Sequence, residues 1–577
     1  MTAGLSVTTI AVFAIIGATL VIGARGVAAM RSTSDFLVAS RRVSPLLNAA
    51  AVAGEYLSTA SFLGVAGLMV KDGVGALWYP VGFTAGYVAM LTLVAAPMRR
   101  TGALTVPDFA EARLGSVRLR RLSAVVVLVI ATMYLVPQFI AAGQVLMRVS
   151  GTPYWLGVVT AGAVVATTLA LGGMRAATYV QAFQFLVKLL LFAVPAVWLL
   201  VQVGPQVRAE AFTPLHVTTF AAPTPVQFEL DTVMVLDAPL AIAVDGGPVR
   251  EIPAGEHEAA GGSTWVFPAG AAVPRVVGSA PLGGPEWSVP LLDAGETGHP
   301  LLSTWSVLVA TVLGTMGLPH ILVRFHTSPD GRAARRTAAL TVPLLGAFYL
   351  FPVVYGALGR VLLPELYLSG ATDTVVVALP SRVDPGSVGA MFTAMLAAGA
   401  IAAFLATSLG LVLAMSGALS HDLVPGSLRR LRLTGFFAAG VVVLLALPAS
   451  QLDVGPLVTS AFAVAASTFC PLLVLGIWWS GLTRRGAMAG MSVGLAASAG
   501  VMALGVVLPV EPGMLALLLT SPALLSVPLA FATMIVVSWR TEPPSWAEDA
   551  MLRLHLDDEP RPATRPGGRR SADHSVA

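Results

Sequence analysis

Long apolar stretches are the feature of this sequence that most restricts its fold. A helix needs about 20 mostly apolar residues to cross the roughly 30 Å hydrocarbon core of a membrane. Thirteen stretches of this kind recur along the 577 residues, and only 11% of the residues are charged. Because soluble domains carry far more charge, the sequence predicts an all-α polytopic membrane protein. The predicted spans are 6–29, 46–70, 77–98, 122–147, 154–173, 177–202, 303–324, 337–361, 388–413, 433–450, 455–479, 486–509 and 514–538.

The positions of the arginines predict how the chain is oriented. Short loops rich in Arg and Lys remain in the cytoplasm, and one alternate set of loops holds most of the arginines, including Arg324 at the end of the seventh span. The loops of the other set hold little beyond Lys71, Arg148, Arg360 and Arg382. We therefore expect a multi-pass protein of the plasma (inner) membrane, with the N-terminus outside and the C-terminus in the cytoplasm. The first stretch lacks a positive region and a cleavage site, so it is interpreted as a retained span.

The segment 203–302 is the one long interruption between spans. It contains eleven acidic residues and three arginines, a net charge near −8, which suits an extracytoplasmic location. Stretches such as VQFELDTVMVLD and STWVFPAG have the composition of strands between Gly/Pro turns. We predict a small β-rich insertion, with a flexible loop as the alternative. The polar tail 540–577 is predicted to be largely disordered and cytoplasmic, apart from a short helix around SWAEDAMLRLH.

Two of the spans carry residues that interrupt helices. The second span reads LLNAAAVAGEYLSTASFLGVAGLMV, and the seventh reads STWSVLVATVLGTMGLPHILVRF with two glycines, a proline and a histidine near its end. Unpaired backbone groups are tolerated at membrane depth only where they line a cavity. Transporters use paired broken helices to hold solutes and ions at mid-membrane. A proline kink or a glycine packing contact is the alternative explanation for either break alone.

The spacing of the two breaks predicts an inverted repeat. Five spans separate the two interrupted helices, so they run in opposite directions through the membrane. The predicted organisation is an N-terminal helix in 1–30, a five-helix repeat in 44–202, the insertion, a second five-helix repeat in 303–479, and two C-terminal helices in 480–539.

Several motifs resemble those of a known family. GTMGLPHILVRFHTSPDGRAARR, STSDFLVASRRVSP, GEYLSTASFLG, GGMRAATYVQ and SGALSHDL are similar to motifs of the sodium:solute symporter family, in the same order, and resemble its bacterial cation/acetate branch. The resemblance implies a leucine-transporter-like fold of five plus five inverted helices, with one helix before them and two after. It also implies symport of acetate or another short monocarboxylate with Na⁺, and with H⁺ as an alternative coupling ion.

The same resemblance implies where the coupling cation binds. Gly54 and Leu57 match the carbonyl donors of the first broken helix, while Ala403 and Thr407 match a carbonyl and a hydroxyl donor of a later helix. Neutral oxygen ligands suit a hard, weakly held cation. The sequence departs from many relatives at Ala406, where they have serine. One hydroxyl ligand is therefore missing, which leaves protons open as the coupling ion. The cation-binding candidates are Gly54, Leu57, Ala403, Ala406, Thr407 and Ser408.

Charged residues inside spans are costly, on the order of 2.5–3.5 kcal/mol each at the helix centre. Glu55 lies in the break of the second span, and Lys188 lies well inside the sixth span, on one helical face with Gln181 and Gln184. Lys188 could supply the counter-charge for a monocarboxylate, form a structural ion pair, or extend along its helix toward the membrane surface. Glu55 could pair with a basic group, carry a proton or tune cation affinity. The remaining solute-binding candidates are Tyr56, Ser58, Gly317, Pro319, His320 and Gln138.

Other function classes have weaker support in the sequence. There is no nucleophile triad, metal constellation or phosphate-binding glycine loop, so an enzyme is not expected, and no cofactor is expected beyond the coupling ion. The single cysteine, Cys470, excludes a disulfide within the chain. The net charge of +4 is spread over many loops and does not indicate a nucleic-acid partner. Two alternatives remain: the same fold importing an amino acid, sugar or vitamin, and a solute-binding membrane sensor.

Overall fold

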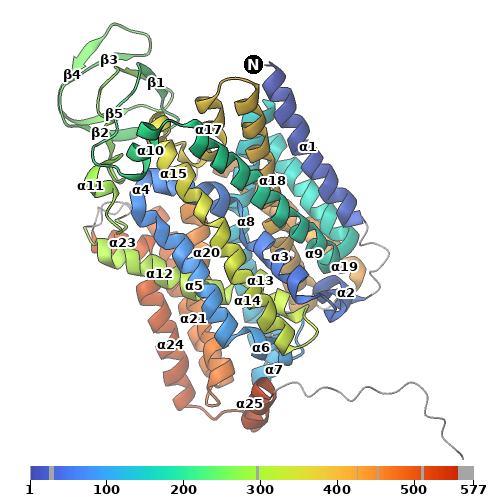
Figure 1. Ribbon diagram of the computed structural model, residues 1–577. Helices are drawn as coiled ribbons and strands as arrows, with labels where there is room; N and C mark the ends of the chain where they lie inside the picture. The colour runs from blue at the N-terminus through green and yellow to red at the C-terminus, as the bar shows by residue number, and fades with distance from the viewer. Residues whose placement is uncertain are drawn as a thin grey trace, which may run out of the picture.

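The computed structural model describes residues 2–24, 32–293, 298–424, 426–450, 454–508 and 513–556. Figure 1 shows a bundle of long helices with small β-sheets at one end. The N-terminus of the first helix lies at the end that carries the sheets, and helix α25 (Ala547–His555) lies at the opposite end. This helix matches the one expected around SWAEDAMLRLH. The predicted disorder of the remaining tail falls on residues 557–577, outside the described part.

Helices long and apolar enough to cross a membrane number ten within the described residues, or up to eleven if one bent pair is counted as a span. Two of these stretches are much longer than one crossing. Ala60–Leu93 has 34 residues and Tyr154–Gln202 has 49, and at 1.5 Å per residue the second would extend over about 74 Å as a straight rod. Gly73 (φ +70°) and Gly173 (φ +52°) interrupt them with backbone angles that favour glycine. Each stretch therefore contributes to two of the thirteen predicted spans.

The first half of the bundle follows the predicted order of spans. After α1 (Thr2–Ala24) and the short α2 (Thr33–Val38), the first repeat comprises α3 (Pro45–Tyr56), the π-helical turn η3 (Ala60–Gly64), α4 (Val65–Asp72), α5 (Trp78–Leu93), α6 (Ala95–Arg100), α7 (Val106–Leu114), α8 (Val117–Ser150) and α9 (Tyr154–Gln202).

The second half repeats the pattern after the insertion. It comprises α12 (Pro300–Gly317), α13 (Pro319–His326), α14 (Gly331–Phe348), α15 (Leu350–Leu362), α16 (Glu365–Leu368), α17 (Val375–Val383), α18 (Ser387–Gly417), η6 (Ala418–Leu423), α19 (Leu428–Ala446) and α20 (Val454–Trp478). Two further spans are built from α21 (Arg484–Leu495), α22 (Val501–Val507), α23 (Met514–Thr520) and α24 (Ala523–Trp539).

Both predicted helix breaks are present. Leu57, directly after α3, has φ −72° and ψ +78°, and Leu318, between α12 and α13, has φ −71° and ψ +113°. The broken helices also run in opposite directions. The backbone amide of Val43, before α3, donates to the carbonyl of Thr327, after α13, so the start of one lies beside the end of the other. This arrangement is the inverted relation that the sequence predicted.

Glycines let the broken helices pack closely against their neighbours. A Cβ atom added to Gly54 would lie 2.1 Å from the carbonyl oxygen of Gln181 in α9. In α12, a Cβ atom added to Gly314 or Gly317 would lie within 2.5 Å of a carbonyl oxygen of α20. Such distances are impossible for real Cβ atoms. The close approach of α3 to α9, and of α12 to α20, therefore requires glycine.

The insertion contains two small antiparallel sheets, as its composition predicted. The strands β1 (Thr224–Gln227), β6 (Thr264–Phe267), β3 (Leu240–Val244) and β4 (Arg250–Ile252) form one sheet in that order, and β5 (Gly255–Ala259), β2 (Thr232–Leu236) and β7 (Arg275–Val276) form the other. In register, Val226 pairs with Trp265 and Met234 pairs with His257. Phe220, Phe228 and Phe267 are buried between the segments. Two helices, α10 (Pro205–Phe212) and α11 (Gly284–Trp287), flank the strands.

Several hydrogen bonds fasten the insertion to the helices beneath it. The indole of Trp78, at the start of α5, donates to the carbonyl of Pro290 at 2.7 Å. The guanidinium of Arg360, in α15, donates to the hydroxyl of Thr218 at 2.7 Å. The hydroxyl of Tyr367, in α16, donates to the carbonyl of Ala280 at 2.7 Å. The insertion is thus attached to helices from both repeats.

Candidate functional site

The break after α3 leaves two backbone carbonyls available to other groups. In a continuous helix the carbonyl of Gly54 would accept from the amide of Ser58, but that amide donates instead to the carbonyl of Tyr56. The ammonium of Lys188, in α9, donates to the carbonyls of both Gly54 and Leu57, at 2.6 Å each. The two carbonyls that the family resemblance assigned to the cation therefore point at the same nitrogen atom.

Lys188 is fully buried in the middle of the protein. Within the described part of the chain, its ammonium forms no ion pair with a carboxylate. These residues therefore do not show the structural ion pair that the sequence left open for Lys188. The positive charge is held by neutral backbone oxygens alone, and burying such a charge is costly.

Glu55 has a buried partner on the other broken helix. Its Oε2 lies 2.6 Å from Nε of Arg324 in α13, and both side chains are fully buried. Arg324 also donates to the hydroxyl of Thr178 at 2.8 Å. The prediction that Arg324 belongs to a cytoplasmic loop is wrong, because α13 continues through it and packs it inside the bundle. Glu55 pairs with a basic group, which was one of the roles that the sequence left open.

Helix α18 packs against this pair and against the break. A Cβ atom added to Gly410 would lie 1.5 Å from Oε1 of Glu55, so only glycine fits there. One turn earlier, the hydroxyl of Thr407 donates to the backbone carbonyl of Glu55 at 2.5 Å. The amide of Gln181 donates to the carbonyl of Ala406 at 2.7 Å. These bonds hold α18, α3 and α9 together around the opened turn.

Two further candidates for the cation site lie on α18. Ala403 is fully buried one helical turn before Thr407. The hydroxyl of Ser408 is buried and has no hydrogen-bond partner among the described residues. Of the candidates on α18, Thr407 contacts the region of the break directly, through the backbone carbonyl of Glu55.

Most of the solute-binding candidates surround the two breaks. The hydroxyl of Tyr56 lies 2.8 Å from that of Thr315 in α12. The hydroxyl of Tyr134, in α8, lies 3.5 Å from that of Ser58. Gln138, also in α8, accepts a bond from the amide of Thr59 at 3.1 Å.

His320 and Gln184 have different surroundings. His320 follows Pro319 in the first turn of α13, directly after the break that ends α12 at Gly317. Its ring is buried, and neither ring nitrogen has a hydrogen-bond partner within the described residues. Gln184 donates instead to the hydroxyl of Thr19 in α1, at 2.9 Å. The structure therefore places His320 with the other candidates and Gln184 away from them.

Pockets lie on both sides of the breaks. One is narrow, with about 20 Å³ open to the centres of water-sized molecules, and is lined by Glu55, His320, Thr105 and Asp422. Another, with about 240 Å³ of such space, begins at Thr59 on the opposite side of the break. It is lined by residues of α8, α17 and α18, including Gln144, Val377 and Thr393. Figure 1 shows α17 near the end with the sheets, whereas α7 lies toward α25.

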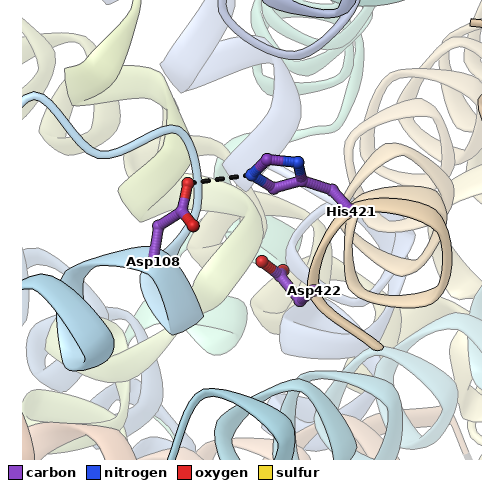
Figure 2. A group of neighbouring side chains, drawn as sticks. All are labelled: Asp108, His421 and Asp422. Atoms are coloured by element: carbon purple, nitrogen blue, oxygen red, sulfur yellow. Dashed lines mark hydrogen bonds and ion pairs between the residues drawn. The ribbon is translucent and has the colours of Figure 1, made fainter. Parts of the chain in front are cut away.

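A cluster of ionisable side chains borders the first pocket at Asp422. Figure 2 shows Asp108, from α7, facing His421 and Asp422, from η6. Nε2 of His421 lies 2.9 Å from Asp108. The guanidinium of Arg120 lies 2.9 Å from Asp108 and 3.0 Å from Asp422. Sequence reasoning missed this cluster, although the motif SGALSHDL contains two of its members.

The cluster fits an ion-pair network better than a metal centre. Its three ligand-type side chains have atoms within 4.8 Å of one another, but Arg120 already forms ion pairs with both carboxylates. Burial alone would raise the pKa of Asp108, yet the hydrogen bond with His421 and the charges of His421 and Arg120 lower it below its usual value of 3.8. We assign the network to the linkage of α7, α8 and η6.

Comparison with known proteins identifies the family. The model of the sodium:solute symporter family matches residues 36–228 and 294–494. The chain is 26% identical over 540 residues to the uncharacterized symporter YwcA of Bacillus subtilis (strain 168), covering 90% of this chain and 91% of the relative.

Solved structures share the fold at low sequence identity. A Na⁺-coupled sialic acid symporter in a substrate-bound outward-open state matches with a TM-score of 0.65 and 11% identity, covering 93% of this chain and 98% of that one. Mhp1, a nucleobase-cation-symport-1 family transporter in a closed conformation with bromovinylhydantoin bound, matches with a TM-score of 0.50 and 14% identity, covering 90% and 98%. The fold is thus the leucine-transporter-like fold that the sequence predicted. With the family model matching more than half of its length, the chain belongs to the sodium:solute symporter family of multi-pass membrane transporters.

Proposed function

We propose that this symporter imports acetate or a related short monocarboxylate, coupled to inward flux of Na⁺ or H⁺, by alternating access. The observation that carries the proposal is the charge balance at the two breaks. Lys188 and Arg324 contribute two buried positive charges there, and Glu55 contributes one negative charge. A small anion would compensate the excess charge, whereas a neutral sugar would leave it uncompensated.

The start of α13 supports a carboxylate as the bound group. The first amides of a helix have no partner within the helix, and the helix dipole favours negative charge at this end. His320 lies in this first turn, buried, lining the inner pocket, and its ring nitrogens have no partner among the described residues. A carboxylate could accept hydrogen bonds from the one N–H group of a neutral His320 ring and from the backbone amides of this turn. Tyr56, Ser58 and Gln138 are the proposed polar neighbours on the other side of the breaks.

The proposed cation position is the opened turn of α3. The carbonyls of Gly54 and Leu57 converge there, and Thr407 of α18 donates to the neighbouring carbonyl of Glu55. Ala403 and Ser408 are the further proposed contributors from α18. The sequence departs from relatives at Ala406, whose carbonyl accepts from Gln181. Oxygen ligands of this kind would supply binding without a permanent charge, which allows the ion to be released.

Alternating access would use the pockets on either side of the breaks. We propose that the end with the sheets is extracytoplasmic and that the end with α25 is cytoplasmic, in line with the arginine distribution. Solute and cation would enter from the outer pocket and leave through the inner one, past Asp108 and His421. Cotransport of one cation with one monocarboxylate anion moves no net charge, so the cation gradient alone would drive it. With two cations per anion, one net positive charge enters, and 100 mV supplies about 2.3 kcal/mol, enough for about 50-fold accumulation.

Uptake into proteoliposomes tests the proposal. Vesicles containing the purified chain should accumulate labelled acetate against its gradient when a Na⁺ or H⁺ gradient is imposed. Unlabelled propionate should compete, whereas acetamide, which has acetate's shape without its charge, should not. Equal competition by acetamide, or uptake of an amino acid or sugar in place of acetate, would refute the solute assignment. Acetate binding without gradient-driven accumulation would instead indicate a sensor.

A further inference from the structure

The position expected for a coupling cation already contains a positive charge. The ammonium of Lys188 is 2.6 Å from the carbonyl oxygens of both Gly54 and Leu57. These are the oxygens that the family resemblance assigns to Na⁺. The lysine belongs to α9, and its side chain reaches across to the opened turn of α3.

The neighbouring charges do not explain why the ammonium lies there. The carboxylate of Glu55 is engaged by Arg324 at 2.6 Å. Within the described residues, the Lys188 ammonium donates to the two backbone carbonyls and contacts no acidic side chain. The carbonyls are therefore the site that holds the charge. A lysine ammonium is a compact cation with three donors, so it makes the same kind of contact with these oxygens as a bound monovalent ion.

Two cations cannot share this pair of oxygens. Two unit charges 4 Å apart repel by about 4 kcal/mol at an effective dielectric constant of about 20. Gly54 also packs closely against α9, where an added Cβ atom would lie 2.1 Å from the carbonyl oxygen of Gln181. The donor set of the expected Na⁺ position thus fits Na⁺ only after the lysine has moved.

We propose that the Lys188 ammonium is a built-in cation that competes with Na⁺ for the carbonyls of Gly54 and Leu57. Sodium binds at this position only when the lysine side chain withdraws from the opened turn. The inference rests on the proposed function for the identity of the cation position. It goes beyond that function by assigning Lys188 to the control of ion binding, as a specificity-determining residue.

The size of the effect follows from the fraction of time that the lysine is withdrawn. If the ammonium occupies the carbonyls for about 90–99% of the time, the apparent Kd for Na⁺ is about 10–100 times higher than its intrinsic value. Removing the charge should therefore tighten Na⁺ binding by about 10- to 100-fold. A lysine with a purely structural role would give the opposite result, since its loss would loosen the opened turn.

Equilibrium binding of radioactive Na⁺ to the full-length chain in nanodiscs tests the competition at one fixed pH and without any solute. Lys188→Met and Lys188→Gln remove the charge and should bind Na⁺ more tightly than wild type. Lys188→Arg keeps a cation at the same place and should bind Na⁺ no more tightly than wild type. Gln184→Met is the matched control, because Gln184 lies one turn away on α9 and contacts Thr19 of α1.

The outcomes are decisive in both directions. Tighter Na⁺ binding by either neutral variant supports the proposal, and it cannot result from misfolding because misfolding abolishes binding. Unchanged or weaker binding by Lys188→Gln, with the variant eluting as a monodisperse species, overturns it. If the chain does not import acetate, the Na⁺-binding measurement still tests the competition, because it contains no solute and measures only ion binding. Conversely, acetate import with no effect of Lys188 on Na⁺ binding would refute only the competition.

Discussion

The buried ion pair between Glu55 and Arg324 gives the sharpest prediction about stability. The pair joins the two broken helices, with 2.6 Å between Nε and Oε2 and both side chains fully buried. Breaking a buried pair by removing one partner leaves a charge without compensation, at a cost of about 3–5 kcal/mol. We expect a destabilisation of this size for Glu55→Gln and, separately, for Arg324→Met.

The double variant separates charge pairing from packing. When both charges are removed, neither partner is left uncompensated, so the double variant should recover most of the lost stability. The coupling energy from the double-mutant cycle should then be about 3 kcal/mol or more. The measurement is reversible unfolding of the purified chain by SDS in mixed micelles, followed by tryptophan fluorescence. Glu256→Gln, at an exposed position of strand β5, is the control and should change the stability by less than about 0.5 kcal/mol.

Additive single effects would refute this reasoning. If the double variant lost the sum of the two single costs, the side chains would contribute independently and the pair would not link α3 to α13. Single variants as stable as wild type would have the same consequence.

Three further predictions concern packing, acid stability and topology. Gly410→Ala should destabilise the chain nearly as much as Glu55→Gln, because its Cβ atom would lie 1.5 Å from Oε1 of Glu55. Gly440→Ala is the control and should leave the stability unchanged, because an added Cβ atom there meets no atom within 4 Å. Equal melting temperatures of the two variants would contradict this prediction. The lowered pKa of Asp108 means that its carboxylate contributes stability above its usual value of 3.8 and loses this contribution as the pH falls through the folded value. Asp108→Asn should therefore lower the melting temperature at neutral pH and flatten its decline in acid, and an unchanged pH profile would exclude the network as the cause. On a Cys470→Ala background, Glu256→Cys should react with a membrane-impermeant maleimide added to intact cells, and protection of that cysteine would reverse the proposed orientation.

The sequence predicted the helical framework because its signals are local. Apolar runs of about 20 residues show where a chain can cross a membrane, and the Gly–Leu–Pro sequence at Gly317 shows where a helix must stop. The matched position of the two breaks followed from counting spans. The strands of the insertion were visible in composition, but their pairing was not. β2 pairs with β5 and β7, and such partners are chosen by packing across the insertion.

The partners of the buried charges could not be predicted in the same way. Arg324 directly follows an apolar run, so the rule for loop arginines placed it outside the membrane. The buried Glu55 in the matched helix needed a basic partner, and this is the signal that could have placed Arg324 inside the bundle. Lys188 binds backbone carbonyls, which no pattern of side chains reveals. Gln184 is about 60° around the helix from Gln181, and this rotation turns it toward α1. The motif resemblance named the right region but not these contacts.

The way the insertion is fastened has a mechanical consequence. Trp78, Arg360 and Tyr367 tie the same hundred-residue segment to α5, α15 and α16. A tilt of α5 at this end of the bundle must therefore either drag α15 along or break these bonds. The insertion therefore couples these helices at the end of the bundle where it lies, and replacing it with a short linker would let α5 and α15 move independently.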